Sequence, residues 1–438
     1  MITEKRTSSP NLYGKAKSLI PGGNMLLSKR PEMFLPDLWP SYFSKTNGCK
    51  VWCINGNEYT DMLMTPGTNI LGYNYPSVSE AVAKVVQDGN MSSLNAPEEV
   101  ELAEKLVELH PWADMVRFAR SGGEANALAI RIARAASGRD NIAICGYHGW
   151  HDWYLATNLS DGVGLDNHLL PGLKPKGVPK ILQGTVIPFH YNDLNHLEDI
   201  LKNRSVGVIK MEVFRNVLPE NDFLQKVRQL ANEYGAVLIF DECTSGFRKT
   251  YGGLHKFYNV EPDMAMFGKA LGNGFAVTSV IGRKEVMEAA QTTFISSTFW
   301  TERIGSVAGI STLDAMQKEK SWELITQSGG YFQQKLSNLS QEYGVSLQIS
   351  GLEALTTFSF NSERSLIYKT YLTQEMLKSG YLASTSFYPS ICHTEEILNS
   401  YFEALEPVFQ KIGECEEERS CCDLLEGPVC HDGFKRLN

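Results

Sequence analysis

Several features that define whole classes of protein are missing from this 438-residue chain. No stretch approaches the roughly 20 apolar residues of a membrane-spanning helix. There is no excess of basic residues, since 41 Lys and Arg stand against 50 Asp and Glu for a net charge of −9. This balance argues against nucleic acid or an anionic membrane as a partner. Residues 1–6 (MITEKR) lack the apolar segment of a signal peptide, so we expect a cytoplasmic protein.

Paired cysteine motifs are also absent. The nine cysteines are an odd number scattered through a large chain, and reduced thiols are their expected state. The densest group lies in the C-terminal tail and consists of Cys415, Cys421, Cys422 and Cys430, beside His431. Its spacing matches no Cys-x-x-Cys zinc knuckle, so we expect no metal site. The lack of a Gly-x-Gly-x-x-Gly that opens a βαβ unit argues against a nicotinamide dehydrogenase.

Two apolar runs that end in reactive residues are the most informative part of the chain. Residues 236–240 (AVLIF) lead into Asp241, and residues 264–267 (MAMF) lead into residues 268–274 (GKALGNG). Unbroken apolar runs bounded by glycines and charges predict strands that are buried on both faces. Because open parallel sheets bind ligands at the carboxyl ends of such strands, we expect Asp241 and Lys269 to lie at one edge.

Asp241 and Lys269 together predict pyridoxal phosphate (PLP) chemistry, with both as catalytic residues. The small neighbours of Lys269 allow close approach to a flat ligand, and a desolvated lysine condenses readily with an aldehyde. An acid that faces a pyridine nitrogen keeps this nitrogen protonated, so that the ring remains an electron sink. Either residue alone is more often a paired structural charge, and it is their combination that favours PLP.

Residues 240–248 (FDECTSGFR) and 268–272 (GKALG) resemble the signature of class III PLP-dependent aminotransferases. The branch that they resemble most is that of glutamate-1-semialdehyde aminomutase. The resemblance extends over most of the chain and implies an α/β protein of PLP-dependent transferase fold type I, like aspartate aminotransferase. This fold has a central, mostly parallel seven-stranded sheet and a smaller α+β domain.

The resemblance also suggests how the chain divides. We expect residues 1–60 to be an N-terminal segment that joins the small domain. Residues 61–314 would form the large PLP-binding domain, and residues 315–438 would form the C-terminal small domain.

A phosphate cradle is expected where residues 116–119 (VRFA) lead through Gly122 and Gly123 into a helix. The helix is indicated by apolar residues that share one face between positions 125 and 136. Free N–H groups and the positive end of the dipole at such an N-terminus bind anions. The family has a Ser-Gly-x-Glu-Ala motif in this place, which implies that Gly122 and Gly123 bind the cofactor phosphate through their backbones.

Further cofactor contacts follow from the resemblance alone. Tyr147 and Cys243 would cover the two faces of the cofactor ring. Glu212 matches the acid of a Glu-Pro motif and would lie near the cofactor or pair with a neighbouring residue. His148 and His151 are expected to be ordinary polar loop residues.

Thr298 aligns with a threonine that reaches the phosphate of the neighbouring subunit in relatives. The resemblance therefore implies a homodimer with a phosphate contact across its interface. The Gly-Asn-Pro that follows in the family is replaced here by residues 301–303 (TER), which indicates a variant substrate pocket.

These residues predict an aminotransferase that moves an amino group from an amine donor, such as an amino acid, to a carbonyl acceptor. Pro66 stands near the position of a substrate-facing tryptophan of the aminomutase, and residues 365–418 contain no arginine that could bind a carboxylate. Lys29, Arg30 or Arg248 would then do so, or the acceptor lacks a carboxylate and is a sugar-derived or phosphorylated carbonyl. An aminomutase, a racemase and a non-catalytic binding protein on the same fold are the alternatives.

Overall fold

The computed structural model describes residues 9–160, 164–166, 172–214, 216–418 and 424–433. The chain forms two compact units, of which Pro76–Glu323 is one and Met1–Tyr75 with Leu324–Asn438 is the other. The domain limits expected after residues 60 and 314 would cut through β3 (Glu58–Asp61) and α10 (Arg303–Glu319). The two compact units therefore have other limits than the expected domains.

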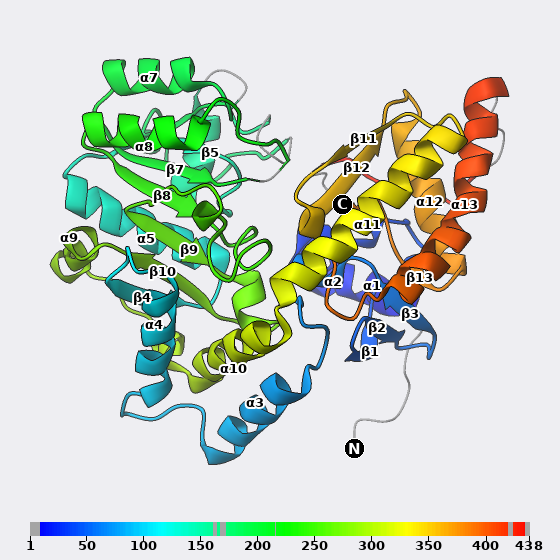
Figure 1. The fold of residues 1–438 in the computed structure, drawn as a ribbon, viewed down its shortest axis with the longest axis horizontal. Helices are drawn as coiled ribbons and strands as arrows, with labels where there is room; N and C mark the ends of the chain where they lie inside the picture. The colour runs from blue at the N-terminus through cyan, green and yellow to red at the C-terminus, as the bar shows by residue number, and fades with distance from the viewer. Residues whose placement is uncertain (1–8, 161–163, 167–171, 215, 419–423, 434–438) are drawn as a thin grey trace. The chain divides into compact units, whose positions relative to one another are not determined.

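The unit Pro76–Glu323 is built on a seven-stranded sheet with the order β4-β10-β9-β8-β7-β5-β6 (Figure 1). The antiparallel strand β10 lies between β4 and β9, while the pairs from β9 to β6 are parallel. The expected mostly parallel seven-stranded sheet is thus confirmed. Its strands are β4 (Met115–Ala119), β5 (Asn141–Cys145), β6 (Val186–Pro188), β7 (Val206–Glu212), β8 (Val237–Asp241), β9 (Met264–Phe267) and β10 (Thr278–Gly282).

The helices of this unit come before, between and after its strands. They are α3 (Pro76–Asp88), α4 (Pro97–Leu109), α5 (Gly122–Ser137), α6 (Asp152–Leu155), α7 (Leu194–Asn203), α8 (Phe223–Glu233), α9 (Lys284–Met287) and α10. The helix expected after the Gly-Gly turn is α5. It begins at Gly122, one of the two glycines expected to bind the phosphate. Its inner face includes Ala125, Leu128 and Ile132, which are buried against the sheet, whereas Ala136 is exposed.

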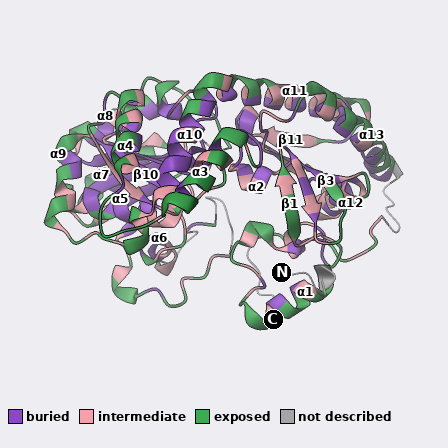
Figure 2. Ribbon diagram, turned by 90° about the horizontal axis from the view of Figure 1, so that it is seen from below, coloured by how far each residue is buried: buried purple, intermediate pink, exposed green. Residues whose placement is uncertain are grey.

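The central strands are buried over their whole length, as the apolar runs predict. Every residue of β7, β8, β9 and β10 is buried, and Figure 2 shows β10 within the buried part of the unit. Residues Ile239, Met264 and Met266 contribute to one apolar cluster with the inner face of α5. Removing this area from water supplies most of the driving force for folding, and it fixes the carboxyl ends of the strands, where the candidate site lies.

The second unit contains two smaller sheets and is of the expected α+β type. One sheet has the order β1-β2-β3-β13 and the other β11-β12-β14. The Asn55-Gly56 turn joins β2 to β3 as an antiparallel hairpin. The remaining elements are β1 (Phe43–Asn47), β2 (Lys50–Cys53), β11 (Leu347–Ser350), β12 (Thr356–Phe360), β13 (Tyr381–Leu382), β14 (Ser386–Phe387), α1 (Ser9–Leu19), α2 (Met64–Gly67), α12 (Ser365–Lys378) and α13 (Glu395–Glu418). Helix α11 (Ser321–Glu342) begins at the end of the first unit.

Two negative observations apply to the described residues. None of their helices combines the length and apolar character needed to span a bilayer. Nor do their His, Cys, Asp and Glu side chains form a group of three or more that could hold a metal ion. In the cysteine-rich tail, Cys415 and Cys430 are buried, while Cys421 and Cys422 lie outside the described residues.

Candidate active site

Asp241 ends strand β8 and is a buried carboxylate with an exposed fraction of 4%. Its Oδ1 accepts a hydrogen bond from the Cys243 backbone N–H at 3.1 Å, and its Oδ2 lies 2.8 Å from His148 Nδ1. Lys210 Nζ lies 3.9 Å from the same Oδ2. Burial by itself would raise the pKa of Asp241, but Lys210 and His148 outweigh it and hold the pKa below its ordinary value. The site therefore contains an ionised carboxylate.

His148 is fully buried and is the nearest side-chain partner of Asp241, contrary to the expectation of an ordinary loop histidine. Its Nε2 lies 3.2 Å from the Cys145 carbonyl oxygen, while its Nδ1 faces the carboxylate. Both ring nitrogens thus face oxygen atoms, and these two contacts fix the orientation of the ring. We infer that His148 orients Asp241.

Lys210 is a second buried partner of Asp241 that the sequence did not reveal. It lies in the middle of β7 with no exposed surface, and its Nζ contacts Met266 Sδ at 2.9 Å. Burial lowers the pKa of Lys210, and the charge of Asp241 opposes this effect. The signal in the sequence was a single basic residue within an apolar strand, because a buried lysine requires a partner.

Lys269 follows β9 and begins the short helix η6 (Lys269–Gly272). Its Nζ donates to Thr244 Oγ1 at 2.9 Å, which places the amine beside the loop that Asp241 begins. Its φ of 42° is in the left-handed region. This conformation is costly for a residue with a side chain, and it is typical of functional sites. Next to it, a Cβ on Gly268 would lie 3.0 Å from Thr278 Cγ2 and 3.4 Å from Cys243 Sγ, so a larger residue would crowd the site.

The residues expected to form the phosphate cradle lie at the N-terminus of α5. Ser121 is the N-cap of this helix and forms a capping box with Glu124. A Cβ on Gly122 would lie 3.8 Å from Cys243 Sγ, which places the cradle close to the loop after β8. A Cβ on Gly123 would lie 2.8 Å from the His151 ring, so this glycine is required by close packing.

Glu212 and Tyr147 lie together at the ends of β7 and β5. The Tyr147 backbone N–H donates to Glu212 Oε2 at 3.0 Å. A Cβ on Gly146 would lie only 2.6 Å from the same oxygen, and the Tyr154 hydroxyl donates to the Gly146 carbonyl at 2.9 Å. The buried Glu212 carboxylate therefore holds the turn that presents the Tyr147 ring.

Thr298 lies in the segment that precedes α10. It is exposed at the start of the short helix η8 (Thr298–Thr301), and its carbonyl accepts from the Thr301 hydroxyl at 2.8 Å. Arg248, a candidate for binding a substrate carboxylate, is fully buried, and its Nε donates to the Thr244 carbonyl at 3.2 Å.

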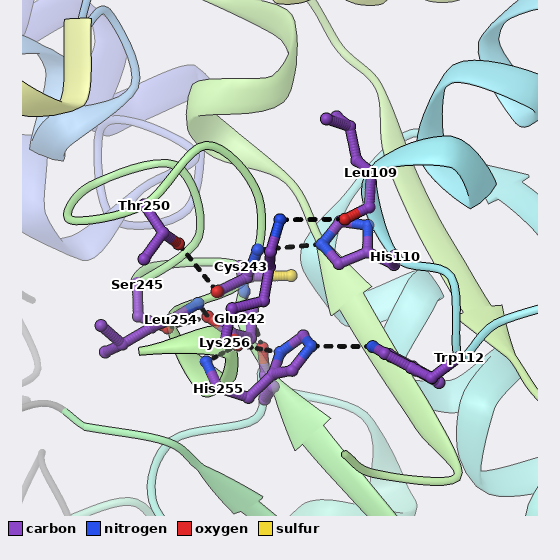
Figure 3. Close-up of polar contacts among 12 residues, drawn as sticks. Leu109, His110, Trp112, Glu242, Cys243, Ser245, Thr250, Leu254, His255 and Lys256 are labelled. Carbon is purple, nitrogen blue, oxygen red and sulfur yellow. Dashed lines mark hydrogen bonds and ion pairs between the residues drawn. The ribbon is translucent and has the colours of Figure 1, made fainter. Parts of the chain in front are cut away.

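A second buried network surrounds Glu242, the residue that follows Asp241 (Figure 3). Glu242 accepts hydrogen bonds from the Ser245 hydroxyl and the Leu254 backbone, and from both the backbone and Nδ1 of His255. Trp112 Nε1–H donates to His255 Nε2 at 2.9 Å, which leaves the Nδ1 of His255 to donate to Glu242. Burial raises the pKa of Glu242, and the contact with His255 reverses this and lowers it.

His110 completes this network and anchors the loop after β8 from behind. Its Nε2 accepts from the Gly253 backbone N–H at 2.9 Å, and its Nδ1 lies 2.9 Å from the Leu106 carbonyl. The ring stacks on Phe267, the last residue of β9, with 4.8 Å between centroids. The loop after β8 thus rests on buried polar contacts, and the His110 ring links this loop to the end of β9.

Comparison with known proteins places this arrangement in a family. The model of the family described as "Aminotransferase class-III" matches residues 37–409. The chain therefore belongs to the class III aminotransferases, which are PLP-dependent enzymes acting on small amines and carbonyl compounds. The family, the fold type and the cofactor expected from the sequence are confirmed.

Individual relatives carry two kinds of name. A 3-aminobutyryl-CoA aminotransferase of Cloacimonas acidaminovorans is 32% identical over 416 residues, covering 92% of this chain and 96% of the relative. A glutamate-1-semialdehyde 2,1-aminomutase of Methanothrix thermoacetophila is 32% identical over 424 residues, with 92% and 96% covered. A solved structure described as a transaminase with PLP bound has a TM-score of 0.82 at 26% identity, covering 96% of this chain and 100% of that one.

The residues of the site fit this cofactor. A pyridine nitrogen requires a buried ionised acid, an aldehyde requires an amine, and a phosphate requires free N–H groups. Asp241, Lys269 and the N-terminus of α5 supply these three groups from one compact unit. Cys243 Sγ is close to both Gly122 and Gly268, and the Cys243 backbone N–H donates to Asp241, so the three groups lie around this residue.

Proposed function

We propose that Lys269 and Asp241 are the catalytic residues of this aminotransferase. The observation that supports this best is the buried Asp241 carboxylate, held by His148 and Lys210, in a loop that also contacts the Lys269 amine. Bound PLP supplies an aldehyde that takes up amino groups and a ring that withdraws electrons from the adjacent carbon. Lys269 would bind the cofactor and, when its amine is free, take a proton from the substrate carbon and return it.

The other candidate residues would hold the cofactor. Asp241 would face the ring nitrogen, and its ionised state would keep that nitrogen protonated. Gly122 and Gly123 would bind the phosphate through their backbone N–H groups, and Tyr147 and Cys243 would lie on opposite faces of the ring. Glu212 would act by holding the Tyr147 turn, because its Oε2 already accepts from the Tyr147 N–H.

We further propose a homodimer in which Thr298 reaches the phosphate bound by a second copy of the chain. Thr298 is exposed and lies between two exposed aromatic residues, Phe294 at 84% and Phe299 at 69%. Large exposed apolar side chains of this kind mark protein interfaces. Replacement of Phe299 by Glu should produce monomers in sedimentation experiments and weaken PLP binding. A Phe299→Glu monomer that binds PLP normally would exclude the contact.

The amine donor and carbonyl acceptor are also proposals. The full burial of Arg248 gives it no open surface for a substrate carboxylate, which supports an acceptor without a free carboxylate near this residue. Such an acceptor could be sugar-derived or phosphorylated. An acyl-CoA compound, the kind of substrate named for one relative, is a further class to be tested. Each class of acceptor would be supplied to the enzyme with an amino acid donor, and consumption of the donor measured.

An intramolecular amino shift is the second candidate function, because relatives named as aminomutases are as similar as the aminotransferase. Dependence on an external donor separates the two. Turnover that requires a donor supports the aminotransferase, whereas turnover of an amino aldehyde without a donor supports the aminomutase. The expected cytoplasmic location remains a prediction, which fractionation of cells would test.

The assignment of Lys269 is tested by Lys269→Ala. This variant should lose turnover and the visible absorbance of lysine-bound cofactor, since no other amine is placed beside Thr244 by the same loop. Lys256, which donates to the Leu109 and Tyr251 carbonyls, offers a matched control. Lys256→Ala should keep the absorbance, and an unchanged absorbance in Lys269→Ala would contradict the assignment.

A further inference from the structure

We propose that Arg120 is a positioning residue that fixes the phosphate cradle to the segment 298–302. The inference rests on the proposed function, in which the backbones of Gly122 and Gly123 bind the cofactor phosphate. Arg120 directly precedes the N-cap of α5, and the segment 298–302 directly precedes α10. The two parts of the chain are far apart in sequence, and the Arg120 guanidinium joins them.

Arg120 makes three contacts to this segment. Its Nη2 donates to the carbonyl oxygens of Trp300 at 2.7 Å and Glu302 at 2.8 Å. Its Nε lies 3.1 Å from Glu302 Oε1, in an ion pair whose side chains are only 12% and 13% exposed. A planar guanidinium can serve several acceptors in fixed directions, which a lysine ammonium cannot do. Little solvent remains to screen the pair.

Glu124 provides a second link between the same two parts. Its Oε2 accepts from the backbone N–H groups of Arg120 at 3.1 Å and Ser121 at 2.9 Å, which is one half of the capping box. Its Oε1 accepts from Trp300 Nε1 at 3.3 Å. The carboxylate that orders the start of the cradle therefore also contacts the segment 298–302.

The start of α10 is shaped to accept Arg120. Glu302 is the N-cap of α10, and its side chain accepts from the Gly305 N–H at 2.9 Å. A Cβ on Gly305 would lie 3.0 Å from Glu302 Oε1 and 3.2 Å from Arg120 Cζ. Any larger residue at position 305 would press on the ion pair. Residues 301–303, where the sequence suggested a variant substrate pocket, thus supply a partner for Arg120.

This arrangement limits how far the first turn of α5 can move. The N–H groups of Gly122 and Gly123 can bind a phosphate tightly only if they already point to it, because reorientation costs binding free energy. Thr298 lies on the segment that Arg120 holds, so in the proposed dimer the same contacts would order the residue that reaches the second copy.

The test compares two ligands that differ only in the phosphate. PLP and pyridoxal are titrated into full-length protein freed of cofactor, for wild type, Arg120→Lys and Trp300→Phe. Arg120→Lys keeps the charge, and Trp300→Phe keeps a smaller aromatic ring and removes the donor to Glu124. Arg131→Lys is the matched control, since Arg131 lies in α5, is exposed and donates to the Phe294 carbonyl at 3.1 Å.

We expect Arg120→Lys to weaken PLP binding about tenfold, the effect of one lost hydrogen bond to a charged group, with little change for pyridoxal. Arg120→Lys should thus raise the ratio of the PLP dissociation constant to the pyridoxal dissociation constant. Trp300→Phe should raise this ratio as well, and Arg131→Lys should leave it unchanged. If both ligands weaken equally, or the ratio stays as in wild type, Arg120 has no positioning role. If wild type itself binds PLP and pyridoxal equally, the proposed cradle fails, and the role of Arg120 with it.

Discussion

His110 should make the fold sensitive to acid, and the size of the effect follows from its contacts. The ring is fully buried, and its Nε2 accepts from the Gly253 N–H. A proton on Nε2 would break this bond and set two N–H groups against each other. Burial also disfavours the charged ring, and it lowers the pKa of His110 from 6.5 to about 4.

The sign of the effect follows from proton counts. Between pH 6.5 and pH 4 the unfolded chain binds a proton at His110 that the folded chain does not, so stability falls as the pH falls through this window. At pH 5 the unfolded residue is almost fully protonated and the folded residue hardly at all. The loss relative to pH 8 is then about 2 kcal/mol of unfolding free energy.

His110→Gln is the variant that isolates this effect. A glutamine amide can accept from Gly253 and donate to Leu106 without titrating. Unfolding in urea would be followed at pH 8 and pH 5 by the fluorescence of Trp112, which is buried in the same network. Acid-sensitive groups elsewhere are common to both proteins and cancel in the comparison.

We expect wild type to lose about 2 kcal/mol more than His110→Gln between the two pH values. His190→Gln, a substitution at an exposed histidine, should behave like wild type. Equal losses in wild type and His110→Gln, within about 0.5 kcal/mol, would refute the assignment of a neutral His110.

Three further predictions concern the site. Asp241→Asn should still bind PLP, but steady-state turnover should fall at least about 100-fold, because the charge opposite the ring nitrogen is lost; near-normal turnover would remove Asp241 from this role. Lys210→Met removes the cation 3.9 Å from Asp241, so the pKa of Asp241 should rise. The loss of cofactor absorbance in acid should then begin at a higher pH. An unchanged titration would show that Lys210 does not lower the pKa of Asp241. Ser121→Ala should cost about 1 kcal/mol in thermal unfolding, and no change in midpoint would show that the capping box is dispensable.

The sequence predicted the buried parallel strands well because their environment is uniform. Strands β8 and β9 are covered on both faces, and apolar runs of the expected length mark them. The short strand β6 and the antiparallel strand β10 were not predicted. β6 has three residues, including Pro188 at its end, and such a segment has no periodicity to detect.

The candidate site could be predicted only where a residue's position depends on the nearby chain. Asp241 and Lys269 follow strands, so their place at the sheet edge follows from local pattern. The partners of Asp241 come from other strands and loops, and their distances depend on sheet order. Lys210 and His148 were therefore missed, as was the partnership between Arg120 and Glu302.

The sulfur of Met266 has a consequence for the interior of the sheet. A thioether is a weak acceptor and cannot match water or a carbonyl in solvating the Lys210 ammonium, although it lies only 2.9 Å away. Most of the attraction on this cation is thus left to the carboxylate on the adjacent strand. A glutamine in place of the methionine would compete for the ammonium and draw it away, so an apolar-looking side chain sets how strongly the two opposite charges are coupled.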